Sequence, residues 1–103
     1  MKLDGNIGGR SGKTYSYYPC VEGVLKYSRE NRDSLFISYF PITPPHGMYD
    51  IPADDPAWEL YKGEKWIEDE SILQDVKNYA AMVSMVDRNV GQMLDVLREL
   101  KLE

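Results

Sequence analysis

The sequence predicts an α/β fold, and two segments support that prediction. Residues 34–40 are almost wholly apolar, contain β-branched and aromatic side chains, and are closed by Pro41. This composition is typical of a central strand that is buried on both faces. Residues 71–100 repeat apolar side chains every three or four positions, which is typical of a long helix packed on a sheet. A chain of 103 residues is long enough for one domain and too short for two.

The chain is expected to begin with a loop and a short helix. Residues 1–18 contain clustered glycines and show no period of 2 or 3.6, so they predict a flexible loop. A helix is predicted over residues 19–31, because Pro19 suits a first helical turn and the apolar residues that follow have helical spacing. A helix that leads into the strand at residues 34–40 is half of an α/β unit.

Residues 41–70 are predicted to form a long loop, because five prolines interrupt them. Within this loop, Asp55 and Pro56 predict a single helical turn, with Asp55 as its N-terminal cap. Three aromatic side chains are expected to anchor the loop on the core: Trp58, Tyr61 and Trp66.

A long amphipathic helix is predicted over residues 71–100, with Ser71 as its candidate cap. A second group of apolar side chains favours packing on a sheet over a coiled coil, because it widens the apolar face. A helix of about 30 residues is roughly 45 Å long, which exceeds the dimensions of a compact chain of this size. One strand also cannot complete a sheet. We therefore expect a piece of a larger assembly or association between copies. The main apolar stripe comprises Ile72, Val76, Tyr79, Val83, Val86, Val90, Met93, Leu97 and Leu100, and the second group comprises Ala80, Met82, Met85 and Leu94.

Composition excludes several classes of function. Twelve Lys and Arg against 17 Asp and Glu give a net charge of −5, which disfavours binding to nucleic acid or to anionic membranes. No apolar run approaches the roughly 20 residues that span a bilayer, and no signal peptide is visible. The sequence thus gives no localisation. A single cysteine and a single histidine exclude an internal disulfide and a zinc site built from these residues.

Three further groups of residues are weak candidates for chemistry. The glycine-rich residues 8–14 depart from a phosphate loop, because Ile7 stands where the first glycine is required. Cys20 lies at a helix start, but no histidine is near in sequence, so it is interpreted as a packing residue. The acidic loop residues fit no calcium-loop spacing and are interpreted as solvated charges, so no metal site is predicted. They are Asp50, Asp54, Asp55, Glu68, Asp69 and Glu70.

His46 is the main candidate for a functional residue. It follows two prolines directly after the predicted strand, where open α/β sheets bind ligands. The prolines restrict the backbone, and Gly47 allows another group to approach closely. A histidine at such a place can donate to an anionic oxygen or protonate a leaving group. The residues alone leave a structural or surface role as the alternative.

Several segments resemble the formylglycine-dependent sulfatases of the alkaline-phosphatase superfamily. Residues 35–40 (Leu-Phe-Ile-Ser-Tyr-Phe) and 43–47 (Thr-Pro-Pro-His-Gly) resemble a strand and the Pro-His motif of that family. Residues 49–56 and 79–94 are similar to the segments that follow, and the likeness extends over about residues 14–103. The resemblance implies a fragment of an arylsulfatase-like α/β sandwich that hydrolyses sulfate esters, with His46 contacting the substrate sulfate. The whole enzyme would use formylglycine and calcium and act on a sulfated small molecule or glycan. It would be periplasmic or secreted.

The nucleophile and metal motifs of those sulfatases are missing from this sequence. Neither Cys/Ser-x-Pro/Ala-x-Arg nor the Asp-Asn-Gly metal motif occurs in it, and residues 20–24 do not fit the former. Without a nucleophile and a cation, a single histidine cannot supply the required rate enhancement. We therefore expect no complete catalytic set, no cofactor in this chain, no activity of the isolated chain, and self-association through strand edges or helix faces. The alternative is a non-catalytic interaction module that docks a partner through its long helix.

Overall fold

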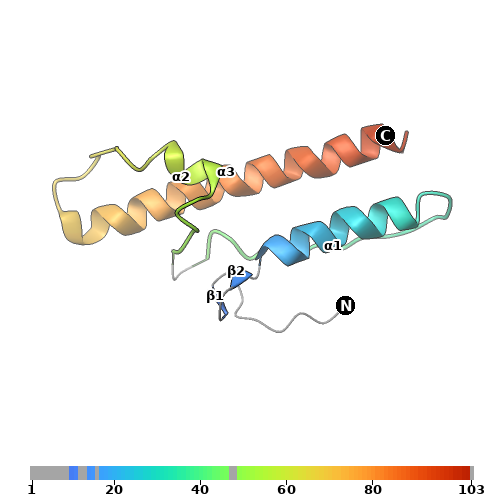
Figure 1. The fold of residues 1–103 in the computed structure, drawn as a ribbon, viewed down its shortest axis with the longest axis horizontal. Helices are drawn as coiled ribbons and strands as arrows, with labels where there is room; N and C mark the ends of the chain where they lie inside the picture. The colour runs from blue at the N-terminus through green and yellow to red at the C-terminus, as the bar shows by residue number, and fades with distance from the viewer. Residues whose placement is uncertain (1–9, 12–13, 16, 47–48, 103) are drawn as a thin grey trace.

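A computed structural model describes residues 10–11, 14–15, 17–46 and 49–102 of the chain. This part is helical and elongated, measuring 53 × 28 × 19 Å (Figure 1). Two strands of two residues each form an antiparallel pair near the N-terminus. The remaining glycine-rich residues of the predicted first loop lie outside the described residues. In chain order the elements are β1 (Arg10–Ser11), β2 (Thr14–Tyr15), α1 (Tyr17–Glu30), α2 (Pro56–Glu59) and α3 (Glu70–Glu99).

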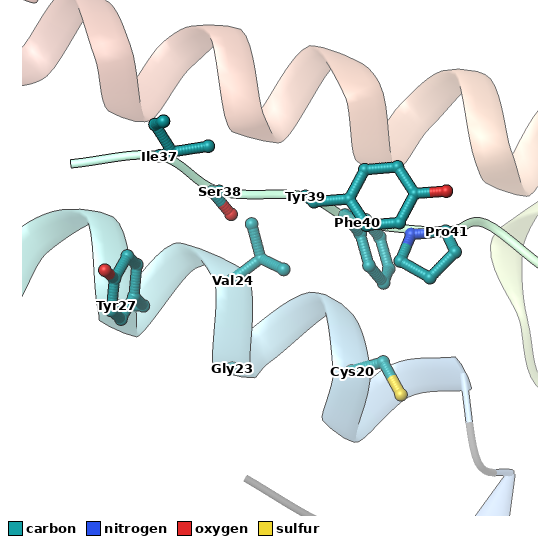
Figure 2. Close-up of a pocket in the computed structure, with 9 residues that line it drawn as sticks. All are labelled: Cys20, Gly23, Val24, Tyr27, Ile37, Ser38, Tyr39, Phe40 and Pro41. Atoms are coloured by element: carbon teal, nitrogen blue, oxygen red, sulfur yellow. The ribbon is translucent and has the colours of Figure 1, made fainter.

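The predicted α/β fold class is wrong, because the segment expected to be a central strand pairs with no strand in the described part of the chain. Residues 34–40 run extended after α1, and Figure 2 shows the part from Ile37 to Phe40 between α1 and α3. The side chains of Leu35, Ile37 and Tyr39 are 103%, 89% and 86% exposed, whereas the prediction had them buried. The fold is therefore all-α, with three helices among the described residues, and the predicted sulfatase-type α/β sandwich is not formed.

The alternation of side chains along this segment explains the error. Phe36 and Phe40 are partly buried and line a cavity with Met93 of α3, while the odd-numbered residues face outward. High β-propensity describes a segment that suits a pleated, half-buried surface, but a strand forms only where a neighbour supplies backbone hydrogen bonds. The helices α1 and α3 supply an apolar surface and no such backbone partner.

Helix α1 provides one side of the core. It begins two residues earlier than the predicted helix over 19–31, and after it Asn31 donates from its backbone N–H to the Tyr27 carbonyl over 3.1 Å. The core then forms where α1 packs against α3 and α2 covers one end, because each helix alone would leave its apolar side in water. Its buried members are Tyr17, Val21, Ile51, Ala57, Ala81, Met82 and Met85.

The helical turn α2 forms as its capping residues predict. Asp55 is the N-cap, its side chain accepts a hydrogen bond from the Ala57 backbone, and Pro56 occupies the first turn. A proline costs nothing there, since that N–H has no partner within a helix. The side chain of Ala57 is buried, so this turn closes the core from the loop side.

Helix α3 is the long C-terminal helix, but its cap differs from the prediction. Asp69, and not Ser71, is the N-cap, and the Ser71 backbone N–H donates to it over 2.9 Å. The Ser71 hydroxyl also donates to the Asp69 carboxylate, and the two hydrogen bonds together lower the pKa of Asp69. An aspartate accepts this bond as well as a serine and also places negative charge at the positive end of the helix dipole.

The buried face of α3 is rotated away from the predicted stripe. Met82 and Met85, from the second apolar group, are fully buried, whereas Val83 and Val90 of the main stripe remain 44% and 39% exposed. We call the exposed apolar face of α3 the outer stripe. Its members are Ile72, Tyr79, Val83, Val90 and Leu94.

Candidate functional site

The imidazole of His46 is exposed on the long loop that follows the extended segment. Pro44 before it is buried, Pro45 is partly buried, and the peptide bond between the two prolines is cis. Gly47 lies outside the described residues. In the part of the chain that the structure describes, no group of three His, Cys, Asp or Glu side chains is arranged to hold a metal ion. His46 thus lies at the surface, next to two prolines of which Pro44 is buried.

The most connected polar group lies farther along the same loop, at Asp55. Its residue is only 3% exposed. One carboxylate oxygen accepts from the Ala57 backbone N–H and from Arg88 Nη1, both at 2.8 Å. The other accepts from Arg88 Nη2 at 2.9 Å and from the Tyr18 hydroxyl. The carboxylate is therefore fully satisfied, and its bidentate pair with Arg88 has the geometry of a strong charge-assisted interaction. We call this group the Asp55 network: Tyr18, Asp55, Ala57 and Arg88.

The electrostatics of the Asp55 network follow from burial and hydrogen bonding together. Burial alone would raise the pKa of the Asp55 carboxyl, but hydrogen bonds from Arg88, Tyr18 and Ala57 outweigh it, so the pKa is lower than usual. The same pair raises the pKa of Arg88. Both groups are therefore charged at neutral pH.

The Asp55 network joins three parts of the chain that are distant in sequence. Tyr18 comes from the first turn of α1, Asp55 from the loop, and Arg88 from the middle of α3. The interpretation of Asp55 as a solvated charge was wrong, because its carboxylate is buried where these three parts of the chain meet. The sequence did contain one signal: Arg88 follows Met85 by three residues, which places a cation on the face that α3 buries.

Beside this network, Tyr17 carries a buried hydroxyl. Its ring stacks on Phe40, with centroids 6.0 Å apart and planes inclined by 9°. The hydroxyl has no hydrogen-bond partner among the described residues. Burial raises the pKa of Tyr17, although the positive charge of Arg88 acts in the opposite direction. The ring thus contributes packing, while its hydroxyl is desolvated without compensation.

Both halves of the loop contact the N-terminal half of α3. The Tyr61 hydroxyl and Ser84 Oγ are 2.8 Å apart, and Asn78 Nδ2 donates to the Tyr49 carbonyl over 2.8 Å. Tyr61 and Trp58 are partly buried against the core, as predicted. The prediction for Trp66 is wrong: it is 47% exposed, and its ring makes an edge-to-face contact with Tyr61 instead of packing on the core.

An apolar groove of about 390 Å³ lies between α1 and the extended segment (Figure 2). Cys20, Val24 and Tyr27 form its α1 side, at the spacing of one helix face, and Ile37 and Tyr39 lie on the other side. Cys20 is a half-buried free thiol. The groove therefore has the lining of a packing surface, and Cys20 contributes to it as a small apolar residue.

Comparisons with protein-family models, with curated proteins and with solved structures find no match to this chain. Among the described residues, no helix has both the length and the apolar character required to cross a membrane. His46, the Asp55 network and the exposed apolar surfaces are therefore the features on which a function can rest.

Proposed function

We propose that this chain supplies the sulfate-contacting histidine, His46, of a sulfatase-type hydrolase, and that the isolated chain does not turn over sulfate esters. The observation that supports this proposal is the Asp55 network. Residues around Tyr18, Asp55 and Arg88 all belong to stretches that resemble sulfatase sequences, and they meet in one buried hydrogen-bonded group. The network fixes the loop that carries His46 against α1 and α3.

The proposed role of His46 is to bind the sulfate group of the substrate and to transfer a proton. An exposed imidazole can donate an N–H to a sulfate oxygen, and in its protonated form it can deliver a proton to the leaving alcohol. The buried Pro44 and the network at Asp55 fix the two ends of the loop that carries this side chain. The substrate class would be a sulfate ester of a small molecule or glycan.

The remaining catalytic parts of such a hydrolase do not fit the residues of this chain. Formylglycine would require a Cys/Ser-x-Pro/Ala-x-Arg motif, which the sequence does not contain. Calcium requires several oxygen ligands, and the described residues present no such group. Both groups are therefore proposed to come from other polypeptide, and the role of this chain is confined to His46.

The proposal is tested on the genomic reading frame around this sequence. A Cys-x-Pro-x-Arg motif upstream and an Asp-Asn-Gly motif downstream are expected. In the longer enzyme, His46→Ala should lower kcat/KM for para-nitrophenyl sulfate by about 100-fold, since acid–base groups typically contribute that much. Leu60→Ala, at a residue 63% exposed, serves as the control and should leave the rate unchanged. A frame without both motifs, full activity of the His46 variant, or turnover by the isolated chain would contradict the proposal.

A second function, a non-catalytic interaction module, is favoured by one specific observation. The outer stripe leaves apolar side chains of α3 between 39% and 47% exposed along most of the helix. An amphipathic helix with an uncovered face is a common docking element. A reading frame that starts and stops around these residues would favour this function over the hydrolase.

A further inference from the structure

The outer stripe forms a second, straight apolar face on α3. Its members follow one another at intervals of 7, 4, 7 and 4 residues. At 100° per residue they fall within a band about 60° wide along the whole helix. The residues that pack on α1, such as Met82 and Met85, lie on a different side of α3. The helix therefore has one apolar face inside the molecule and another whose side chains are 39–47% exposed, where the Tyr79 ring makes an edge-to-face contact with Tyr49.

The extended segment carries further exposed apolar side chains. Phe36 and Phe40 line a cavity of about 280 Å³ together with Met93 and Leu97, which border the outer stripe on α3. The three large apolar side chains that point outward from the same segment, Leu35, Ile37 and Tyr39, are 86–103% exposed. Exposed apolar area of this extent on a small protein marks interaction surfaces.

We propose that the outer stripe binds a second copy of this chain, with the two α3 helices antiparallel. The stripe is complementary to its own reversed copy. With a twofold axis between Val86 and Asp87, Tyr79 lies opposite the second copy's Leu94, and Val83 opposite its Val90. The half-buried Val76 and Leu97 form the next layer. Such an isologous contact closes with two copies.

Charge and length also favour the antiparallel copy. This register brings Glu70, at the N-terminus of one α3, within about one turn of Lys101 of the second copy. A parallel pair would instead place like charges and like helix ends together. A stable dimer buries about 800 Å² on each partner, roughly a tenth of the 7368 Å² exposed by this chain. A helix of 30 residues, about 45 Å long, offers contact over nearly the full length of the molecule.

The oligomeric state of the whole chain tests the proposal. Sedimentation equilibrium should give twice the chain mass of 11.9 kDa. Val83→Glu places a charge in the centre of the contact and should weaken dimerisation at least tenfold. Leu60→Glu, an equally drastic change at an exposed leucine outside α3, should leave the dimer intact. Circular dichroism should show equal helix content for all three proteins. A wild-type monomer at about 100 µM, or a dimer that survives Val83→Glu, would overturn the proposal and assign the stripe to another partner.

Cross-linking tests the orientation of the two helices. Copies carrying Val83→Cys and Val90→Cys, each in a Cys20→Ser background and with tags of different size, are mixed and oxidised. The antiparallel register predicts a disulfide between the two different variants. Disulfides only between identical variants would indicate a parallel pair and contradict the proposal.

Discussion

Asp55 and Arg88 show how two side chains can join a loop to a helix that is distant in sequence. The Asp55 side chain is 1% exposed and that of Arg88 is 34% exposed, so the pair is buried at the carboxylate and open at the guanidinium. A buried carboxylate is tolerated only when its lone pairs are satisfied, and four donors satisfy them here. Removing one partner would therefore leave a charge without compensation, which lowers the free energy of unfolding.

The lowered pKa of Asp55 predicts acid sensitivity. Its folded-state pKa lies below that of the unfolded chain, so the unfolded state binds more protons as the pH falls. The stabilisation is complete above about pH 4, the ordinary aspartate range, and is lost as the pH falls through the lower folded-state value. Urea titrations at a series of pH values should show this loss. Asp55→Asn should flatten the profile, whereas Asp33→Asn, at an exposed site, should follow the wild type.

Tyr17 predicts a stabilising substitution. Its buried hydroxyl finds no partner among the described residues, while its ring stacks on Phe40. Tyr17→Phe keeps the ring and removes the desolvated group, so it should raise the free energy of unfolding by roughly 1 kcal/mol. Thermal unfolding of the two proteins provides the measurement. A loss of stability would mean that the hydroxyl is satisfied in solution.

At the scale of elements, the C-terminus of α3 ends without the glycine that commonly stops a helix. Lys101 takes a left-handed conformation, with φ of 59°. The Leu102 N–H donates to the Leu97 carbonyl over 2.9 Å, and the Lys101 N–H to the Arg98 carbonyl over 3.0 Å. This is the hydrogen-bond pattern of a Schellman cap, formed here by a residue with a Cβ atom.

Lys101→Gly should therefore stabilise the chain. Glycine adopts positive φ without the steric cost of about 1 kcal/mol that a side chain incurs, so the expected gain in unfolding free energy is about 0.5–1 kcal/mol. Urea denaturation of the variants measures it. Lys101→Ala, which retains the Cβ atom, is the matched control and should give no gain. Equal stability of the two variants would argue against the left-handed conformation.

In the extended segment, substitutions at nearby residues should differ strongly in their effect on the free energy of unfolding. Ile37 is 89% exposed, whereas Phe40 is partly buried and stacks on Tyr17. Ile37→Ser should change the unfolding free energy of the monomer by less than about 0.5 kcal/mol, and Phe40→Ala should cost about 2–4 kcal/mol. Denaturation curves measure both effects. Equal destabilisation by the two changes would indicate a strand buried on both faces.

The sequence predicted local structure better than tertiary partners. The cap at Asp55, the first-turn Pro56 and the long C-terminal helix depend on neighbours in the chain, and local spacing was sufficient for them. The strand over residues 34–40 and the buried face of α3 depend on which distant surface each segment meets. Composition alone cannot supply that choice, because both apolar faces of α3 have helical spacing.

At the scale of the whole molecule, the fold is an elongated pair of helices with a loop tied across it (Figure 1). The radius of gyration of 15.7 Å exceeds the roughly 13 Å of a compact chain of this length. The length of the predicted C-terminal helix already indicated that the chain would be longer than a compact domain of this size. It selected His46 as a candidate site residue but missed the Asp55 network, because that network exists only when α1, the loop and α3 meet. The Asp55–Arg88 pair is the buried part of this network that joins the loop to α3.

A double-mutant cycle measures that contact most directly. The free energies of unfolding of the wild type, Asp55→Ala, Arg88→Ala and the double variant are compared under one set of conditions. We expect each single change to cost about 2–4 kcal/mol and the coupling between the two residues to be about 2 kcal/mol or more. A coupling near zero, with both single variants close to the wild type, would contradict the claim that this pair holds the loop to α3.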